Sequence, residues 1–165
     1  RGHFFTPHIL KKVNGEDITI PEFTEMKQTT IERKYFEPVI QGMADVYHKG
    51  TARWVQIPDI EIAGKTGTVE NYTIIDGVKT QLTDHSIFVA FAPVNNPKIA
   101  IAVYIENGYY GSRYAGHIAS LMIEKYIKGE ITRKDLEKRM LEKTLDHEYA
   151  KPYSGEEFKI NEYVW

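Results

Sequence analysis

The most apolar part of the chain is a pair of segments, residues 85–92 and 98–106, joined by a loop rich in proline and asparagine. Near-continuous hydrophobicity of this kind is typical of strands that are buried on both faces. The turn-forming residues between the segments allow the chain to reverse direction. We therefore predict two central strands of a sheet that are covered on both faces, with helices on at least one side.

Alternating apolar and polar positions predict strands before this pair. Ile60 and Ile62 alternate with their neighbours from Asp59 onward, and the pattern leads into residues 64–68. Residues 14–15 and 76–77 are Asn-Gly and Asp-Gly, the dipeptides that favour tight hairpin turns. We predict one hairpin from residues 3–6 and 8–10 to residues 17–20, with Pro7 at an edge strand or a bulge, and another from residues 73–75 to 78–80.

Apolar residues at helical spacing predict two amphipathic helices. The first begins near Glu37, with Pro38 in its first turn, and ends at Gly50. The second follows Ser112, which we expect to cap it, and ends at Gly129. The apolar stripe of the first helix contains Phe36, Val39, Ile40, Met43 and Tyr47, and that of the second contains Ala115, Ile118, Ala119, Met122 and Tyr126.

The chain becomes strongly charged after Gly129. Of the 22 residues from 130 to 151, 12 are Asp, Glu, Lys or Arg. Thr132 and Asp135 resemble a capping box. We predict a solvent-exposed helix, followed by a tail that ends in Tyr163-Val164-Trp165. Its thin apolar face would contain Leu136, Met140 and Leu141.

These elements give an α+β fold, an antiparallel sheet with packing helices. The 165 residues are 42% hydrophobic and 27% charged, which is typical of a folded chain. A net charge of −2 argues against nucleic-acid binding, and no apolar run reaches the roughly 20 residues that span a bilayer. There is no cysteine, and the six histidines show no metal-ligand spacing. We therefore expect neither a metal nor another cofactor.

The sequence Gly64-Lys65-Thr66-Gly67-Thr68 is the first candidate for chemistry. It is not a phosphate loop, because the position that requires the loop's first glycine is Asp59. In a strand, Lys65 and Gly67 would share one face and the two threonines the other. A cation, two hydroxyls and a row of N–H groups can hold a carboxylate and a developing oxyanion. The alternative is an edge strand with a solvated lysine.

Two other segments contain suggestive side chains. Asp84-His85-Ser86 has the residues of a serine triad without its geometry, because neighbours on a strand point to opposite faces. We expect His85 to have a backbone partner where its strand begins. Residues 109–114 contain three tyrosines and Arg113, which would form either an aromatic rim over a groove or a loop packed on its own side chains.

In their order and spacing, these motifs resemble the transpeptidase domain of class B penicillin-binding proteins, in particular the elongation-type penicillin-binding protein 2. The resemblance covers roughly residues 1–128. Lys-Thr-Gly alone is common, whereas the whole ordered set is highly specific. The resemblance rests on residues 1–2, 6–9, 42–43, 46, 50–52, 63–68, 84–86, 91–93, 96–97 and 106–108.

The resemblance implies a serine-type D,D-transpeptidase that cross-links peptidoglycan stem peptides and is acylated by β-lactams. In that family the site is built from Ser-x-x-Lys, Ser-x-Asn and Lys-Thr-Gly motifs. Lys65 would support proton transfer, and Thr66, Gly67 and Thr68 would bind the carboxylate of the substrate or drug. The backbone N–H of Thr68 would supply half of the oxyanion hole.

The other two motifs are missing from this chain. None of its four serines, Ser86, Ser112, Ser120 and Ser154, begins a Ser-x-x-Lys or a Ser-x-Asn sequence. We therefore expect a C-terminal part of the domain with a cut end at Arg1, inactive alone and not acylated by penicillin. Residues 1–129 would belong to the transpeptidase domain, and residues 130–165 would form a charged helical extension and tail.

The resemblance also implies partners and a location. The parent protein would be anchored by an N-terminal helix outside this chain, on the periplasmic face of the bacterial inner membrane. Its partners would be peptidoglycan, β-lactams, the upstream part of the domain and the elongation machinery, with no nucleic acid. The alternatives are part of a serine β-lactamase or β-lactam sensor, which share the fold, and a non-catalytic peptide-binding module.

Overall fold

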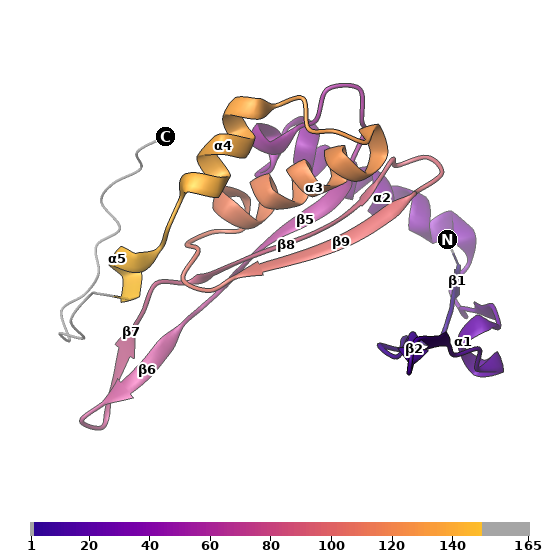
Figure 1. The fold of residues 1–165 in the computed structure, drawn as a ribbon, viewed down its shortest axis with the longest axis horizontal. Coiled ribbons are helices and arrows are strands. Elements are labelled where there is room, and N and C mark those ends of the chain that lie inside the picture. The colour runs from indigo at the N-terminus through magenta and orange to yellow at the C-terminus, as the bar shows by residue number, and fades with distance from the viewer. Residues whose placement is uncertain (1, 150–165) are drawn as a thin grey trace. The chain divides into compact units, whose positions relative to one another are not determined.

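The structure, a computed structural model, describes residues 2–149. It divides the chain into two compact units, residues 1–41 and 42–165 (Figure 1). Arg1, Ser154 and the aromatic end of the predicted tail, Tyr163-Val164-Trp165, lie outside the described residues.

The first unit contains two small antiparallel pairs instead of the single hairpin that we predicted. The turn at Asn14-Gly15 is confirmed, with φ values of 51° and 86°. However, the strands beside it are only two residues long, and the first run pairs elsewhere. The pairs are β1 (His3–Phe4) with β4 (Lys27–Gln28) and β2 (Lys12–Val13) with β3 (Glu16–Asp17).

Long-range polar contacts explain this difference. The Lys27 ammonium donates to the Thr6 hydroxyl at 2.7 Å, and the Thr29 N–H donates to the Gly2 carbonyl at 2.9 Å. Pro7 has no N–H for a longer ladder, so residues 8–10 form no strand. The unit also contains the short helix α1 (Pro21–Thr24) and the 3-10 turn η1 (Arg33–Tyr35).

Helix α2 (Phe36–His48) begins within one residue of the predicted start. Its end is followed by Gly50, whose N–H donates to the Asp45 carbonyl at 3.0 Å. An added Cβ at Gly50 would lie 2.8 Å from the Cα of Val46. Glycine is therefore required here by a close approach to the last helical turn. The 3-10 turn η2 (Arg53–Val55) follows.

A three-stranded antiparallel sheet in the order β5-β8-β9 forms the centre of the second unit. Strands β8 (His85–Ala92) and β9 (Ile99–Ile105) lie where predicted. Strand β5 (Ala63–Val69) begins later than predicted, because a turn with Asp59 at a φ of 65° joins Ile57 to Ile60 first. The predicted second hairpin is confirmed as β6 (Tyr72–Ile75) and β7 (Val78–Gln81).

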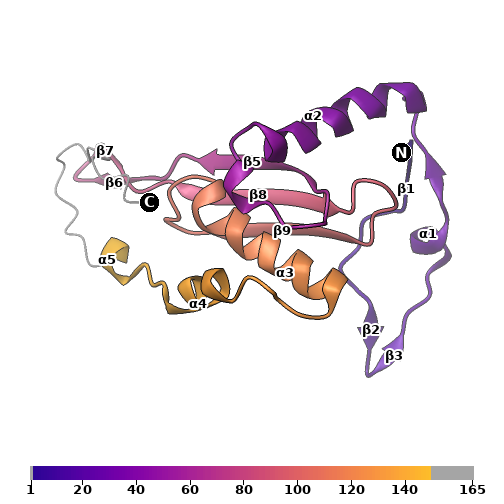
Figure 2. The ribbon, with the colours of Figure 1, turned by 90° about the horizontal axis from the view of Figure 1, so that it is seen from above.

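One face of this sheet is covered by α3 (His117–Lys128) and by the short π-helix η3 (Ser112–Gly116) that precedes it (Figures 1 and 2). Phe88 at the centre of β8 is fully buried, and Tyr47 packs edge-on against it, with ring centroids 5.7 Å apart. Burial raises the pKa of Tyr47 well above its ordinary value. Its hydroxyl has no hydrogen-bond partner within the described residues.

The opposite face of the sheet is open, so the prediction of strands covered on both faces is wrong for the described part of the chain. Val89 is 40% exposed and Tyr104 50% exposed. No described helix of the second unit lies on that side of the sheet (Figure 1). Continuous hydrophobicity indicates that both faces of a strand are to be buried, but it does not identify the segment of the protein that packs on each face. The open face contains Ile87, Val89, Phe91, Ala100, Ala102 and Tyr104.

The buried stripe of α3 is rotated relative to the prediction. Ala115 and Ala119 face the core as expected, but Met122 and Tyr126 are exposed and Ile123 is fully buried. Ser112 lies inside η3 and makes no capping bond, whereas Gly129 ends the helix as predicted, with a φ of 80°.

A buried ion pair ties α3 to the segment that follows it. The side chain of Glu124 is fully buried, accepts from the Thr132 hydroxyl at 2.5 Å and pairs with Arg133 at 2.9 Å. The predicted capping box is therefore wrong, because Thr132 bonds Glu124 instead of capping α4 (Lys134–Glu142). Arg133 also donates to the Gln56 carbonyl at 3.1 Å. The short helix α5 (Asp146–Tyr149) ends the described chain.

Replacing Glu124 tests this ion pair. Burial would raise the pKa of Glu124, but hydrogen bonds from Thr132 and Arg133 outweigh it and lower the pKa. We expect Glu124→Gln to reduce the free energy of unfolding by about 3 kcal/mol at pH 7, because Arg133 loses its counter-ion. Since the folded pKa is lowered, the pair stabilises fully above the unfolded pKa of about 4.3, and this contribution is lost as the pH falls through the folded value.

The measurement is urea unfolding of the chain at pH 7 and at pH 3. Glu142→Gln is the matched control, because that exposed carboxylate makes only a 3.8 Å pair with Lys138 and should contribute under about 1 kcal/mol. An equal loss for Glu124→Gln at both pH values would contradict the prediction.

The open sheet face predicts self-association of the isolated chain. We expect sedimentation velocity to show dimers or larger species, and Val89→Lys or Tyr104→Lys to shift the chain toward monomer. The control is Leu141→Lys on α4, where an apolar side chain that is 81% exposed lies outside the sheet. If the wild-type chain remains monomeric at concentrations of about 100 μM, a range where exposed apolar surface drives association, the prediction fails.

Candidate active site

Strand β5 is an edge strand that carries Lys65, Thr66, Gly67 and Thr68. It pairs with β8 on one side, and its other edge has no partner strand within the described residues. Lys65 and Thr68 are exposed, whereas Thr66 and Gly67 are half-buried. An unpaired edge presents backbone N–H and C=O groups to an extended peptide.

The register confirms the predicted alternation along β5. Lys65 and Gly67 lie opposite Val89 and Ile87, on the open face of the sheet. Thr66 and Thr68 lie opposite Phe88 and Ser86, on the face that the helices cover. The cation and the two hydroxyls are therefore presented on either side of one free strand edge.

Short polar contacts order these side chains. The Lys65 ammonium donates to the Thr66 carbonyl at 2.6 Å and makes no ion pair within the described residues, so its charge is available to an anion. The Thr66 hydroxyl lies 2.8 Å from the Thr51 hydroxyl. Thr51 was missed as a site residue because it follows α2 in the chain, and only the fold brings it to β5.

A loop after β9 supports the middle of β5, and the sequence analysis assigned it no such role. An added Cβ at Gly111 would lie 2.7 Å from both the N and the O of Gly67. The Ser86 hydroxyl donates to the Tyr110 carbonyl at 2.9 Å and holds the loop on the sheet. The repeated glycines around residues 108–111 were the available signal for this close approach.

The structure confirms that Asp84-His85-Ser86 is not a triad. His85 accepts from the Asn107 N–H at 3.1 Å, which is the expected backbone partner. Ser86 is fully buried on the other face. Of the two alternatives for residues 109–114, the structure supports a loop packed on its own side chains, because the Arg113 guanidinium lies 4.2 Å from the ring centroid of Tyr109 and Tyr114 is buried.

We also searched the described residues for exposed serines, metal-ligand clusters and membrane-spanning helices. Ser86, Ser112 and Ser120 are buried. Residues 2–149 contain no cluster of three or more potential metal ligands. Across the same range, no helix has both the length and the hydrophobicity needed to cross a bilayer.

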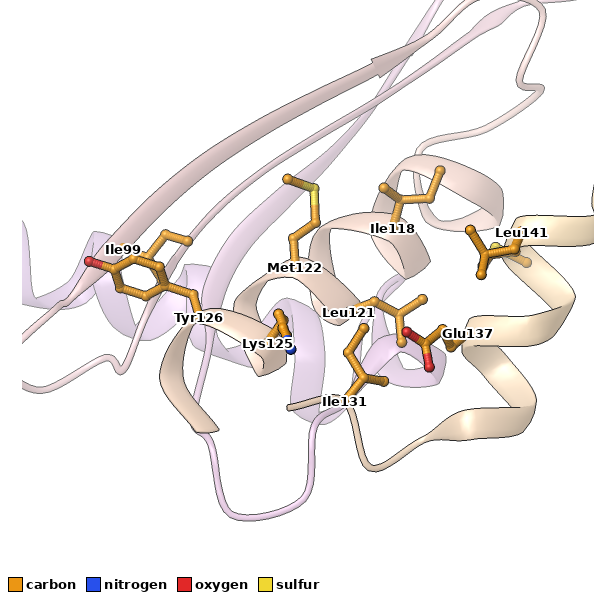
Figure 3. A pocket seen from close by; sticks show the side chains of 10 residues that line it. Ile99, Ile118, Leu121, Met122, Lys125, Tyr126, Ile131, Glu137 and Leu141 are labelled. Atoms are coloured by element: carbon orange, nitrogen blue, oxygen red, sulfur yellow. The ribbon is translucent and has the colours of Figure 1, made fainter. Parts of the chain in front are cut away.

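An apolar groove of about 540 Å³ lies between α3 and α4 (Figure 3). Met122 and Leu121 line it from α3, and Leu141 lines it from α4. None of the residues of β5 lines this groove. It therefore forms no part of the site at Lys65.

Comparison with known proteins identifies the family. Residues 1–124 match the family described as "Penicillin binding protein transpeptidase domain". The chain is 33% identical over 123 residues to the peptidoglycan D,D-transpeptidase MrdA of Acinetobacter baumannii, which covers 69% of this chain and 18% of that protein. The MrdA of Escherichia coli is 30% identical over 117 residues, covering 64% of this chain and 18% of that protein.

Solved structures give the same result. PBP2 of Pseudomonas aeruginosa, in complex with WCK 5153, aligns with a TM-score of 0.54 and 32% identity, covering 78% of this chain and 28% of that chain. Penicillin-binding protein A of M. tuberculosis, as an imipenem acyl-enzyme complex, aligns with a TM-score of 0.51 and 27% identity, covering 62% and 21%. The chain belongs to the penicillin-binding protein transpeptidase family, as the resemblance predicted. It spans about a fifth of the length of the curated relatives.

Gly111 provides a test of how the loop supports β5. Gly111→Ala would place a Cβ 2.4 Å from the Ile87 carbonyl, so we expect a loss of about 3 kcal/mol in the free energy of unfolding. The control is Gly42→Ala inside α2, where an added Cβ meets nothing within 4 Å. That change should stabilise by about 0.5–1 kcal/mol. Urea unfolding of both variants measures the difference, and similar effects at the two positions would contradict it.

Proposed function

We propose that the chain supplies the Lys-Thr-Gly part of the active site of a peptidoglycan D,D-transpeptidase, a serine acyltransferase that β-lactams acylate. The family match together with β5, a free strand edge with an exposed cation and hydroxyls, carries the proposal. An imipenem acyl-enzyme among the structural relatives supports β-lactams as ligands. Stem peptides of peptidoglycan would lie along the same edge as an added strand.

Each residue of the motif has a distinct role in this proposal. The Lys65 ammonium helps proton transfer and attracts the carboxylate of the stem peptide or drug. The hydroxyls of Thr66 and Thr68 bind that carboxylate, and Gly67 allows it to approach the backbone. The Thr68 N–H donates to the oxyanion that develops on the carbonyl under attack.

The nucleophile and the remaining site residues come from sequence outside these 165 residues. The outer edge of β9 has no partner strand in residues 2–149. This edge and the open face of the sheet are the surfaces that the rest of the domain would cover. Residues 1–129 would belong to that domain and residues 130–165 would extend it. The chain alone should neither turn over substrate nor be acylated, because an oxyanion hole acts only on a substrate held beside it.

We further propose that the complete protein works at the periplasmic face of the bacterial inner membrane, anchored by an N-terminal helix outside this chain. Peptidoglycan is assembled outside the cytoplasm, so a cross-linking enzyme must face that compartment. The elongation machinery would be its protein partner. The names of the MrdA relatives support the class of enzyme and not these partners.

The decisive experiment labels native cells with a tagged penicillin. The protein that contains the peptide 63–70 is isolated, and its mass and labelled peptide are determined. We expect a protein several-fold heavier than 19.0 kDa with a single adduct on a serine outside these 165 residues. A native product of about this mass without drug would instead favour a peptide-binding module.

Substitution of Lys65 in that protein completes the test. We expect Lys65→Ala to lower the acylation rate constant by about 10²–10³, as for loss of a group that stabilises the transition state. Lys98→Ala is the control, because Lys98 is an exposed lysine in the loop between β8 and β9. Equal acylation of the two variants would exclude the proposed role of Lys65.

A further inference from the structure

A buried carboxylate in the C-terminal extension bonds to the loop after β9 that supports β5. Glu148 belongs to α5, beyond the family match, which ends at residue 124. Its side chain is only 1% exposed. A carboxylate buried to this extent is stable only where hydrogen-bond donors surround it.

The donors come from two segments far from Glu148 in the chain. The Thr83 hydroxyl, just before β8, donates to Glu148 at 2.5 Å. The Tyr109 hydroxyl, after β9, donates to the other carboxylate oxygen. His147 lies 3.0 Å from that same oxygen, so an imidazole also faces the carboxylate. Hydrogen bonds to an ionised acceptor are about twice as strong as neutral ones, so α5 holds both segments firmly.

Tyr109 is held in an unusual backbone conformation. Its φ is 68°, in the left-handed region that non-glycine residues rarely adopt. Its N–H donates to the Asp84 carbonyl at 2.9 Å, and Arg113 stacks on its ring. Such a conformation persists only where surrounding contacts enforce it, and the bond to Glu148 is one of these contacts.

Tyr109 is two residues before Gly111, which rests on β5. An added Cβ at Gly111 would lie 2.7 Å from the Gly67 oxygen. That oxygen and the Thr68 N–H belong to the same planar peptide group. The position of Gly111 therefore limits the tilt of the peptide whose N–H we assign to the oxyanion hole.

We propose that Glu148 is a positioning residue for acylation, because it orients the Gly67–Thr68 peptide through Tyr109 and Gly111. The extension would thus fix the loop that rests on the active-site strand β5. The inference rests on the proposed function, since the oxyanion role of Thr68 belongs to that proposal.

The test uses the full-length protein that contains this chain, with fluorescent penicillin and stopped-flow kinetics. Saturation kinetics separate the acylation rate constant from the dissociation constant of the initial complex. We expect Glu148→Ala and Tyr109→Phe each to lower the acylation rate constant about tenfold, less than the 10²–10³ lost with an oxyanion donor itself. The dissociation constant should change less than about twofold, because the oxyanion forms only in the transition state.

Two further variants separate positioning from general stability. The double variant Tyr109→Phe with Glu148→Ala should be no slower than Glu148→Ala alone, because that substitution already removes the contact between the carboxylate and the Tyr109 hydroxyl. Glu142→Ala is the matched control, an exposed glutamate of the same extension that pairs with Lys138. It should leave the acylation rate constant unchanged.

The outcomes are distinct. A wild-type protein that penicillin does not acylate would overturn the proposed function itself. If wild type is acylated and Tyr109→Phe keeps the wild-type acylation rate constant, the positioning role of Glu148 is overturned. Should Glu148→Ala fail to fold, Tyr109→Phe decides alone, because it deletes one hydroxyl. Equal changes in both kinetic constants would likewise contradict the proposal.

Discussion

The antiparallel pairing of β5 with β8 is the contact on which the rest of the second unit depends. It places Gly67 opposite Ile87 and Thr68 opposite Ser86, and so determines which side chains reach each face. Through β8 the strand also gains its core, because fully buried Phe88 packs against Tyr47. The outer edge of β5 stays unpaired in the described residues. In our proposal, that edge binds the stem peptide or the β-lactam.

Two buried carboxylates attach the extension to the rest of the second unit in different ways. Glu124 has a charged partner, Arg133, and secures α3 to the chain before α4. Glu148 accepts from the hydroxyls of Thr83 and Tyr109, which belong to the loops that flank the sheet. The first pair serves mainly stability. The contacts of Glu148 reach the loop that supports the proposed oxyanion donor, so we link Glu148 to acylation.

Sequence analysis was most successful where the local pattern alone decides the structure. Both dipeptide turns and the helix end at Gly129 are set by the backbone preferences of Asn, Asp and Gly. The bounds of β8 follow from its continuous apolar run. It was less successful where distant groups compete. Thr132 has the side chain of a helix cap, but its hydroxyl bonds Glu124, because a buried carboxylate requires a donor more than an exposed helix end does.

For the candidate site, the sequence by itself determined the family, the motif from Lys65 to Thr68 and the alternation of its side chains. These follow from the order of short motifs and from the two-residue period of a strand. Only the tertiary structure brought Thr51 and Gly111 to β5 and Glu148 to Tyr109, and only the tertiary structure shows that one face of the sheet is open. Contacts between residues far apart in the chain depend on packing, and a one-dimensional pattern contains no record of which distant residue meets a given strand.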